Sequence, residues 1–265
     1  MNDMQIAFVM KDLAHRAGRM ILSAYGKAED SVSAKGNANF VTEYDVTIQE
    51  HLIRRLKQEL PHAVFIAEEQ ENESDLLMEE CCFIIDPIDG TTNFIHDYKQ
   101  SSVSIAMVSR GVVKIGVIYD PYRNEMYHAI RGQGAYLNDK PIHVSKRPLE
   151  LAVVAFGTSP YYKDTLCDKT FALAKDLFKA ASDIRRTGSA AIDFTQVAAG
   201  RVDTFFEWKL SPWDFAAGLL LVAEAGGKVT CLDGSETDLS RPCSILATNG
   251  VNHDAALAIA KSYCD

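Results

Sequence analysis

The sequence lacks any apolar run that approaches the roughly 18 residues a membrane-spanning helix needs. Its N-terminal segment is interrupted by Asp3, Lys11 and Asp12, so it does not form the apolar core of a signal peptide. Positive charge is scarce as well, because 27 lysines and arginines face 36 aspartates and glutamates, for a net charge of −9. Generic nucleic-acid binders carry a basic stripe, and this chain does not. We therefore expect a cytoplasmic protein that binds no membrane and for which a nucleic-acid partner is disfavoured.

Cysteines with metal-site spacing are also missing. No Cys-x-x-Cys pair occurs, and the adjacent Cys81 and Cys82 do not have the spacing of zinc ligands. In a reducing cytoplasm disulfides are rare. We expect free, mostly buried thiols at all six positions, which are Cys81, Cys82, Cys167, Cys231, Cys243 and Cys264.

Apolar residues are present in sufficient number for a large folded core. Hydrophobic residues make up 47% and charged residues 24% of the 265 positions, a balance typical of folded globular proteins rather than disordered chains. A chain of this length has one or two domains.

The N-terminal half begins with helical periodicity and continues with strand patterns. The expected elements are a helix at 4–25, a loop or hairpin at 27–39, a second helix ending before Pro61, strands at 64–66 and 82–85, and an antiparallel meander over 102–137. Thr42 lies three residues before Asp45, which is a typical start for the second helix.

After Pro148 helices and strands alternate. The expected strands are 151–156, 182–187, 202–206, 228–231 and 244–249, and the expected helices are 163–181, 189–199, 213–225 and a last one from 252. Mixed elements in two parts predict a layered α+β architecture, with a seam near 145–152. We place the halves at 1–147 and 148–265.

The most informative stretch is 84–94, in which Asp86 and Asp89 flank Pro87 directly after an apolar run. Proline fixes its own φ and biases the preceding residue toward extended backbone, so both carboxylates have defined directions. Converging carboxylates repel one another unless a hard cation such as Mg²⁺ lies among them. The N–H groups of Gly90, Thr91 and Thr92 at a following helix start are suited to phosphate oxygens. The alternative is that this segment is only a turn.

Two further acidic features accompany this motif. Residues 68–80 hold seven acids and no base, typical of a solvated and partly flexible face, but Glu68 and Glu69 directly follow an apolar strand that would hold them rigidly. Asp214 lies in the first turn of the helix at 213–225. It either contributes to the same site or only caps its own helix.

Together these motifs resemble the inositol monophosphatase family of Mg²⁺-dependent, lithium-sensitive phosphatases. The segments that carry the resemblance are 86–94 (DPIDGTTNF), 213–218 (WDFAAG), 224–227 (EAGG), 41–45 (VTEYD), 188–191 (GSAA) and 67–69 (AEE). Only Ala67 departs from the family pattern, which has glycine at that position. The segments span nearly the whole chain.

The resemblance implies a fold, a metal site and a mechanism. The fold is the layered αβαβα sugar-phosphatase sandwich, commonly a homodimer. Two to three Mg²⁺ ions are implied, with Glu68, Asp86 and the carbonyl of Ile88 at the first, Asp86, Asp89 and Asp214 at the second, and Glu68 also at a weaker third. Thr91 paired with Asp45 is implied to orient and deprotonate a metal-activated water for in-line displacement with no covalent intermediate. Glu68 is counted with this catalytic set.

The implied activity is hydrolysis of inositol 1-phosphate to inositol and phosphate. Substrate contacts are expected at Gly90, Thr91, Thr92, Gly188, Ser189, Ala190, Glu207 and Asp214. Glu207 corresponds to a family position that binds substrate hydroxyls, which favours a polyol; otherwise it is an exposed glutamate at a strand end.

Other readings of the same residues stay open. One alternative is the same chemistry on another substrate, namely fructose 1,6-bisphosphate, NADP(H) or 3′-phosphoadenosine 5′-phosphate. Lys209 and the Arg185–Arg186 pair either bind a second phosphate or belong to solvated surface. A regulatory binding protein is a less favoured alternative, because every expected ligand is present.

Overall fold

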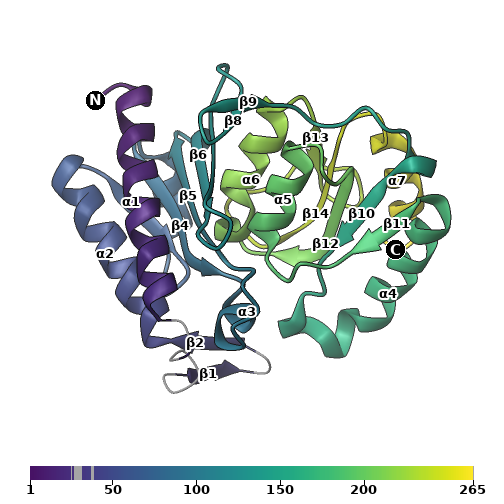
Figure 1. Ribbon diagram of the computed structural model, residues 1–265, viewed down its shortest axis with the longest axis horizontal. Coiled ribbons are helices and arrows are strands. Elements are labelled where there is room, and N and C mark those ends of the chain that lie inside the picture. Colours follow the sequence, from purple (N-terminus) through teal and green to yellow (C-terminus); the bar gives the residue numbers. More distant parts are fainter. Residues whose placement is uncertain (25, 27–31, 37–38, 265) are drawn as a thin grey trace.

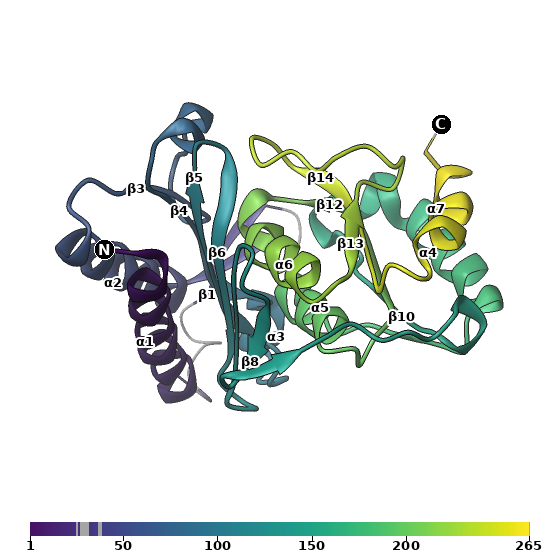
Figure 2. The same cartoon turned by 90° about the horizontal axis from the view of Figure 1, so that it is seen from above.

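The computed structural model describes residues 1–24, 26, 32–36 and 39–264. Five layers lie side by side: an outer helix pair, a seven-stranded sheet, a central helix pair, a five-stranded sheet and a second outer helix pair (Figures 1 and 2). The expected α+β class with αβαβα layering is therefore confirmed.

The seven-stranded sheet comes from one continuous stretch of chain. Its order is β3-β4-β5-β6-β7-β8-β9, and only β3 and β4 pair in parallel. The strands are β3 (Val64–Ala67), β4 (Cys82–Asp89), β5 (Ser102–Ser109), β6 (Val112–Asp120), β7 (Glu125–Ile130), β8 (Ala135–Leu137) and β9 (Lys140–Ile142). The antiparallel meander is confirmed, and β9 is an additional strand that the sequence pattern did not indicate.

Helices α1 (Asp3–Ser23) and α2 (Glu43–Glu59) cover the outer face of this sheet. Thr42 caps α2 as expected, since its side chain accepts the Tyr44 N–H while the Asp45 carboxylate accepts the Thr42 N–H. This reciprocal capping fixes Asp45 at the buried start of the helix.

The five-stranded sheet has the order β11-β10-β12-β14-β13. Its strands are β10 (Val153–Phe156), β11 (Asp183–Arg185), β12 (Thr204–Leu210), β13 (Lys228–Thr230) and β14 (Cys243–Thr248). Helices α4 (Lys163–Ala180) and α7 (His253–Lys261) cover its outer face, and α5 (Ala190–Ala198) and α6 (Pro212–Glu224) form the central layer.

Shorter elements join these layers. They are the antiparallel hairpin of β1 (Val32–Gly36) and β2 (Asn39–Thr42), the helix α3 (Thr91–Ile95), and the 3₁₀ turns η2 (Ser74–Met78), η3 (Leu149–Leu151) and η4 (Pro160–Tyr162). The loop or hairpin expected at 27–39 is thus a hairpin where it is described, while 27–31 and 37–38 lie outside the described residues.

The central helices pack against both sheets. A glycine at position 116 lets α6 approach β6 closely, because a Cβ there would lie 2.7 Å from the Ala217 carbonyl oxygen. One core cluster includes Ile84 and Tyr127 from the first sheet and Phe205 from the second. The boundary that we place between 147 and 148 lies in the connection from β9 to β10, and the two halves share this core.

Two further properties of the described chain bear on the sequence-based expectations. None of its helices has both the length and the apolarity required to span a bilayer. The six cysteines are free thiols, of which Cys82 and Cys231 are buried and Cys167 is exposed. The thiols are therefore less buried than expected.

Candidate active site

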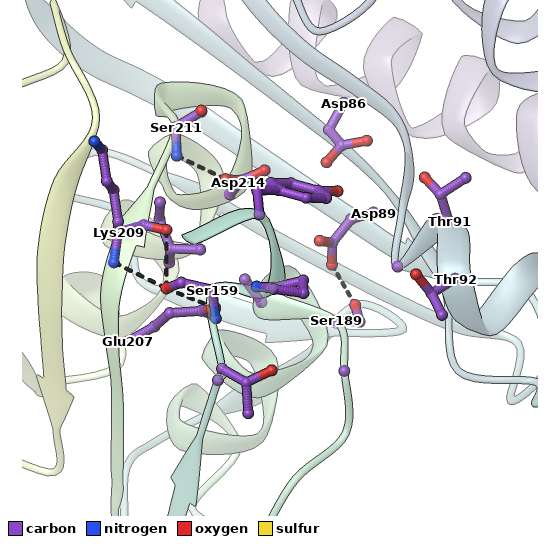
Figure 3. Close-up of a pocket in the computed structure, with 18 of the residues that line it drawn as sticks. Asp86, Asp89, Thr91, Thr92, Ser159, Ser189, Glu207, Lys209, Ser211 and Asp214 are labelled. Carbon is purple, nitrogen blue, oxygen red and sulfur yellow. Dashed lines mark hydrogen bonds between the residues drawn. The ribbon is translucent and has the colours of Figure 1, made fainter. Parts of the chain in front are cut away.

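A cavity of about 310 Å³ lies where the end of β4 faces β12 and the start of α6 (Figure 3). All expected site residues except Asp45 line it, so segments far apart in sequence meet here. They are Glu68, Asp86, Ile88, Asp89, Gly90, Thr91, Thr92, Gly188, Ser189, Ala190, Glu207 and Asp214. Asp45 lies directly behind Thr91.

A β-bulge in β4 sets the directions of the Asp86 and Asp89 side chains. The ladder with β5 pairs Asp86 with Ser104 and Asp89 with Ser102, so β4 has one extra residue in this interval. Pro87, which cannot donate to the ladder, lies within this bulge. The segment is therefore a bulged strand end rather than a simple turn, and both side chains reach the cavity.

Asp89 is held on one side by donors from the start of α5 and from β5. Its Oδ2 accepts hydrogen bonds from the Ser189 hydroxyl and from the Ala191 N–H at 2.9 Å, with the Ser102 hydroxyl at 3.5 Å. The side chain of Ser189, expected at a substrate contact, thus contacts Asp89 in this structure. These donors leave Oδ1 of Asp89 available for another ligand.

Asp214 both caps α6 and joins the other carboxylates. Its Oδ2 accepts the Ser211 N–H at 2.7 Å, and the Ser104 hydroxyl on β5 donates to the Trp213 carbonyl at 3.3 Å. Carboxylate oxygens of Asp86, Asp89 and Asp214 lie within 4.8 Å of one another. Asp214 therefore caps its own helix and also lies in the carboxylate cluster, so the two alternatives do not exclude each other.

Asp86 and Asp89 are buried and Asp214 is half-buried, and all three lie among like charges. Burial, followed by the charges of Glu68, Asp89 and Asp214, raises the pKa of Asp86 well above its usual value, and burial and Glu68 do the same to the pKa of Asp214. Burial raises the pKa of Asp89 to about 6. An all-oxygen donor set with such repulsion suits a hard cation, which would restore the ionised forms.

Glu68 lies at the end of β3, and the backbone around it is fixed by neighbours. Its N–H donates to the Ile85 carbonyl at 3.2 Å, and the N–H of Glu69 donates to the Gln49 side chain at 2.9 Å. Of the acids that follow, Asp75 lies in η2, where Leu77 is buried, Leu76 is half-buried and the other residues are exposed.

Asp45 and Thr91 form the expected pair. The Thr91 hydroxyl lies 3.3 Å from Asp45 Oδ1 and 3.1 Å from the Ile88 carbonyl oxygen, while the Thr42 hydroxyl donates to Asp45 Oδ2 at 2.6 Å. Burial raises the pKa of Asp45 to about 6, against the lowering effect of Thr42. A carboxylate with such a pKa is suited to accept a proton near neutral pH.

Glu207 is buried, with 7% of its surface exposed, so the alternative of an exposed strand-end glutamate is wrong. It lies within β12, and its Oε1 accepts the Ser159 N–H at 2.7 Å. Burial raises the pKa of Glu207 to about 7. Figure 3 shows Glu207 across the pocket from Thr91 and Thr92.

The three basic side chains that are candidates for binding a second phosphate differ in position. Arg185 forms an ion pair with Asp183 on the surface. Arg186 and Lys209 line the cavity mouth, where Arg186 donates to the Thr158 hydroxyl at 3.1 Å and the Lys209 ammonium lies 4.0 Å from the centre of the Tyr162 ring. Only Arg185 is therefore plain surface.

Several residues that build the site were not among the expected site residues. Asn93 donates to the carbonyls of Gln100 and Thr187, at 2.7 and 2.9 Å, and so joins α3 to the turn before α5. Gly157 and Ser159, from the turn after β10, also line the cavity. Only Asn93 lies inside a segment that the resemblance had singled out.

Comparisons with known proteins find relatives over most of the chain. A model of the inositol monophosphatase family matches residues 2–264. A protein named putative Nus factor SuhB from Neisseria meningitidis serogroup B is 41% identical over 226 residues, 84% of this chain and 85% of that protein. Nus factor SuhB of Escherichia coli K12 is 42% identical over 224 residues, 83% of each chain.

Solved structures with the same fold cover nearly the whole chain. The extragenic suppressor protein suhB of Bartonella henselae is 36% identical with a TM-score of 0.88, over 98% of each chain. The IMPase of Thermotoga maritima is 35% identical with a TM-score of 0.87, over 96% of each chain.

Proposed function

The chain belongs to the inositol monophosphatase family, and on that premise we propose that it is a Mg²⁺-dependent phosphomonoesterase that hydrolyses inositol 1-phosphate. The observation that carries the proposal is that carboxylate oxygens of Asp86, Asp89 and Asp214 lie within 4.8 Å of one another in a cavity that Glu207 also lines. The first three suit a divalent cation, and the fourth suits a polyol.

The proposed ligand assignment is the one that the family resemblance implies, and all of its residues line the cavity. Glu68, Asp86 and the Ile88 carbonyl would hold one ion, Asp86, Asp89 and Asp214 a second, and Glu68 would also contribute to a third. Bound Mg²⁺ supplies the positive charge that lets carboxylates and a phosphate ester share one site, and it polarises water and the phosphoryl oxygens.

The chain's own residues would orient the reactants. The phosphate would lie beside Gly90, Thr91 and Thr92. Because the Thr91 hydroxyl donates toward Asp45 or the Ile88 carbonyl, its lone pairs are free to accept the proton of the attacking water. As the water proton passes to Thr91 Oγ1, the hydroxyl proton of Thr91 would pass to Asp45, whose raised pKa suits it to accept a proton.

Glu207 would select the substrate. A buried carboxylate accepts hydrogen bonds from hydroxyl groups and repels a second phosphate, which favours a polyol monophosphate over fructose 1,6-bisphosphate or the nucleotide phosphates. Gly188, Ser189 and Ala190 line the same cavity. We also propose the homodimer that is common in the family as the assembly.

A phosphate-release panel tests the proposal. Purified protein is assayed with inositol 1-phosphate, fructose 1,6-bisphosphate, NADP and a 3′-phosphonucleotide, each with Mg²⁺ and with EDTA. We expect Mg²⁺-dependent release with the highest kcat/KM on inositol 1-phosphate. Release from another ester at a higher kcat/KM would reassign the substrate, and no release from any ester would contradict the enzyme assignment.

The names of the curated relatives favour a second candidate, a role of the Nus-factor kind beside catalysis. Replacement of the Escherichia coli relative by this chain, as parent and as Asp89→Asn, separates the two. Function of both forms in the cell would indicate a role that does not need hydrolysis. Function of the parent alone would tie the cellular role to the phosphatase site.

A further inference from the structure

The Glu207 carboxylate lies against a residue with no side chain. A Cβ built on Gly157 would overlap Oε2 and Cδ of Glu207 and lie 2.6 Å from Oε1, and these three atoms are its nearest neighbours. Gly157 is not among the glycines with positive φ, so its backbone is open to other residues. Glycine is therefore required at this position by the carboxylate and not by the turn.

The same turn supplies the carboxylate with its donor. Ser159 has left-handed backbone angles, φ 41° and ψ 62°, which are unusual for a residue with a side chain. Its N–H donates to Glu207 Oε1 at 2.7 Å, and its hydroxyl accepts the Lys209 N–H at 3.1 Å (Figure 3). The turn is thereby tied to β12 at Glu207 and two residues beyond it.

We infer that Gly157 and Ser159 are specificity-determining positioning residues, which hold the Glu207 carboxylate where it accepts hydrogen bonds from substrate hydroxyls. The inference rests on the proposed function, because it takes Glu207 as the group that selects a polyol. A side chain at 157 would displace the carboxylate from the Ser159 N–H. The metal-binding carboxylates are on other elements, so the hydrolytic chemistry would persist while the preference for a polyol is lost.

The clash in Gly157→Ala can be relieved without unfolding the chain. Glu207 ends in a carboxylate on a flexible side chain, so this side chain moves before the backbone does. Gly18→Ala is the matched control, because its Cβ would overlap the edge of the Tyr119 ring in the packing of α1 on β6, away from the cavity. It tests the general cost of adding a methyl group to a tight site.

A double-mutant cycle tests the inference. The parent, Gly157→Ala, Glu207→Ala and the double variant are assayed on inositol 1-phosphate and on p-nitrophenyl phosphate, which offers no hydroxyls. We expect Gly157→Ala to lower kcat/KM on inositol 1-phosphate about tenfold or more, and on p-nitrophenyl phosphate less than about twofold. In the Glu207→Ala background Gly157→Ala should cost nothing further. Gly18→Ala should keep the parent's ratio between the two substrates.

Melting temperatures of the same proteins provide a readout besides activity. Gly157→Ala should lower the Tm of the parent and leave the Tm of Glu207→Ala unchanged, since no carboxylate remains to displace. Ser159→Ala keeps the N–H donor and should shift the substrate ratio less than Gly157→Ala does.

The outcomes separate this inference from the proposed function. A parent protein that does not hydrolyse inositol 1-phosphate contradicts the proposed function. The melting temperatures of the four proteins then still test the contact between Gly157 and the Glu207 carboxylate. A selective parent whose Gly157→Ala variant keeps the parental substrate ratio overturns the inference alone. A loss that persists in the Glu207→Ala background also overturns it, because the glycine would then act through another group.

Discussion

Asp89→Asn should change activity and stability in opposite directions. The Ser189 hydroxyl and the Ala191 N–H both donate to one oxygen of Asp89, so an asparagine must place its carbonyl oxygen there. Its NH₂ group then points toward Asp86 and Asp214, where a cation is proposed. The variant loses a charged ligand and presents donors to the cation, and we expect kcat to fall at least ~10³-fold.

The stability change follows from the pKa of Asp89. Its pKa is about 6 in the folded protein, against 3.8 for the ordinary group, chiefly because it is buried. The folded state therefore binds this proton more tightly than the unfolded state. The tighter binding of this proton stabilises the folded protein fully below pH 3.8, and this stabilisation is lost as the pH rises through about 6. Above that pH the free energy of unfolding is lower by roughly 3 kcal/mol.

Asp89→Asn removes this cost in the metal-free protein. At pH 7.5 in EDTA the variant should melt roughly 5 to 10 °C above the parent, and at pH 4 the two should melt at nearly the same temperature. Mg²⁺ binds the folded parent and should raise its Tm, and it should raise the Tm of the variant much less.

Melting curves at the two pH values, in EDTA and across a Mg²⁺ titration, check the stability, and p-nitrophenyl phosphate hydrolysis checks kcat. Asp193→Asn is a useful control for the thermal response, because burial raises the pKa of Asp193 well above its usual value although it is not among the three clustered carboxylates. It should stabilise the metal-free protein and retain the Mg²⁺-dependent gain in Tm. Parental turnover of Asp89→Asn at saturating Mg²⁺, or a lower Tm than the parent in EDTA at pH 7.5, would refute the reasoning.

Three other outcomes are expected. Lithium should inhibit at millimolar concentration, because Li⁺ can take the place of the ion at Asp86, Asp89 and Asp214; turnover equal to that in KCl of the same ionic strength would count against this. Glu207→Ala should lower kcat/KM for inositol 1-phosphate about 10- to 100-fold, since a charge-assisted hydrogen bond contributes roughly 1.5–3 kcal/mol, and should barely change that for p-nitrophenyl phosphate; equal losses on the two substrates would assign Glu207 to the metal site or the fold. Thiol titration of the unfolded, freshly reduced protein should find six thiols, with the exposed Cys167 reacting first in the native state, and a titre well below six would contradict free cysteines.

The helices were largely predictable from the sequence because their signals are local. Apolar spacing predicted a helix at 4–25, and α1 spans Asp3–Ser23. The capping pair of Thr42 and Asp45 was visible as a spacing of three residues and is present in the structure. Such patterns depend on neighbours within one or two turns, so no tertiary information is needed to find them.

The ends of two strands were not predictable, and both carry site residues. The apolar run 82–85 continues as β4 to Asp89 through Pro87, a residue that normally ends a strand. The run 202–206 continues as β12 to Leu210, because Glu207 pairs with Ile245 and Leu210 with Cys243 on β14. Pairing with a distant strand decided these positions, and a charged residue in a strand gives no local sign of it.

The carboxylate cluster depends on packing between the two halves of the chain. Asp86 and Asp89 end a strand of the first sheet, whereas Asp214 begins α6, which is held to that sheet through the Ser104–Trp213 hydrogen bond. The close approach of Ala217 to the glycine at position 116 fixes the same helix one turn later. Like charges resist this arrangement when no cation is bound, and the apolar core shared by both sheets opposes that repulsion. A motif can therefore reveal which carboxylates are suited to a cation, while their convergence is a property of the shared core.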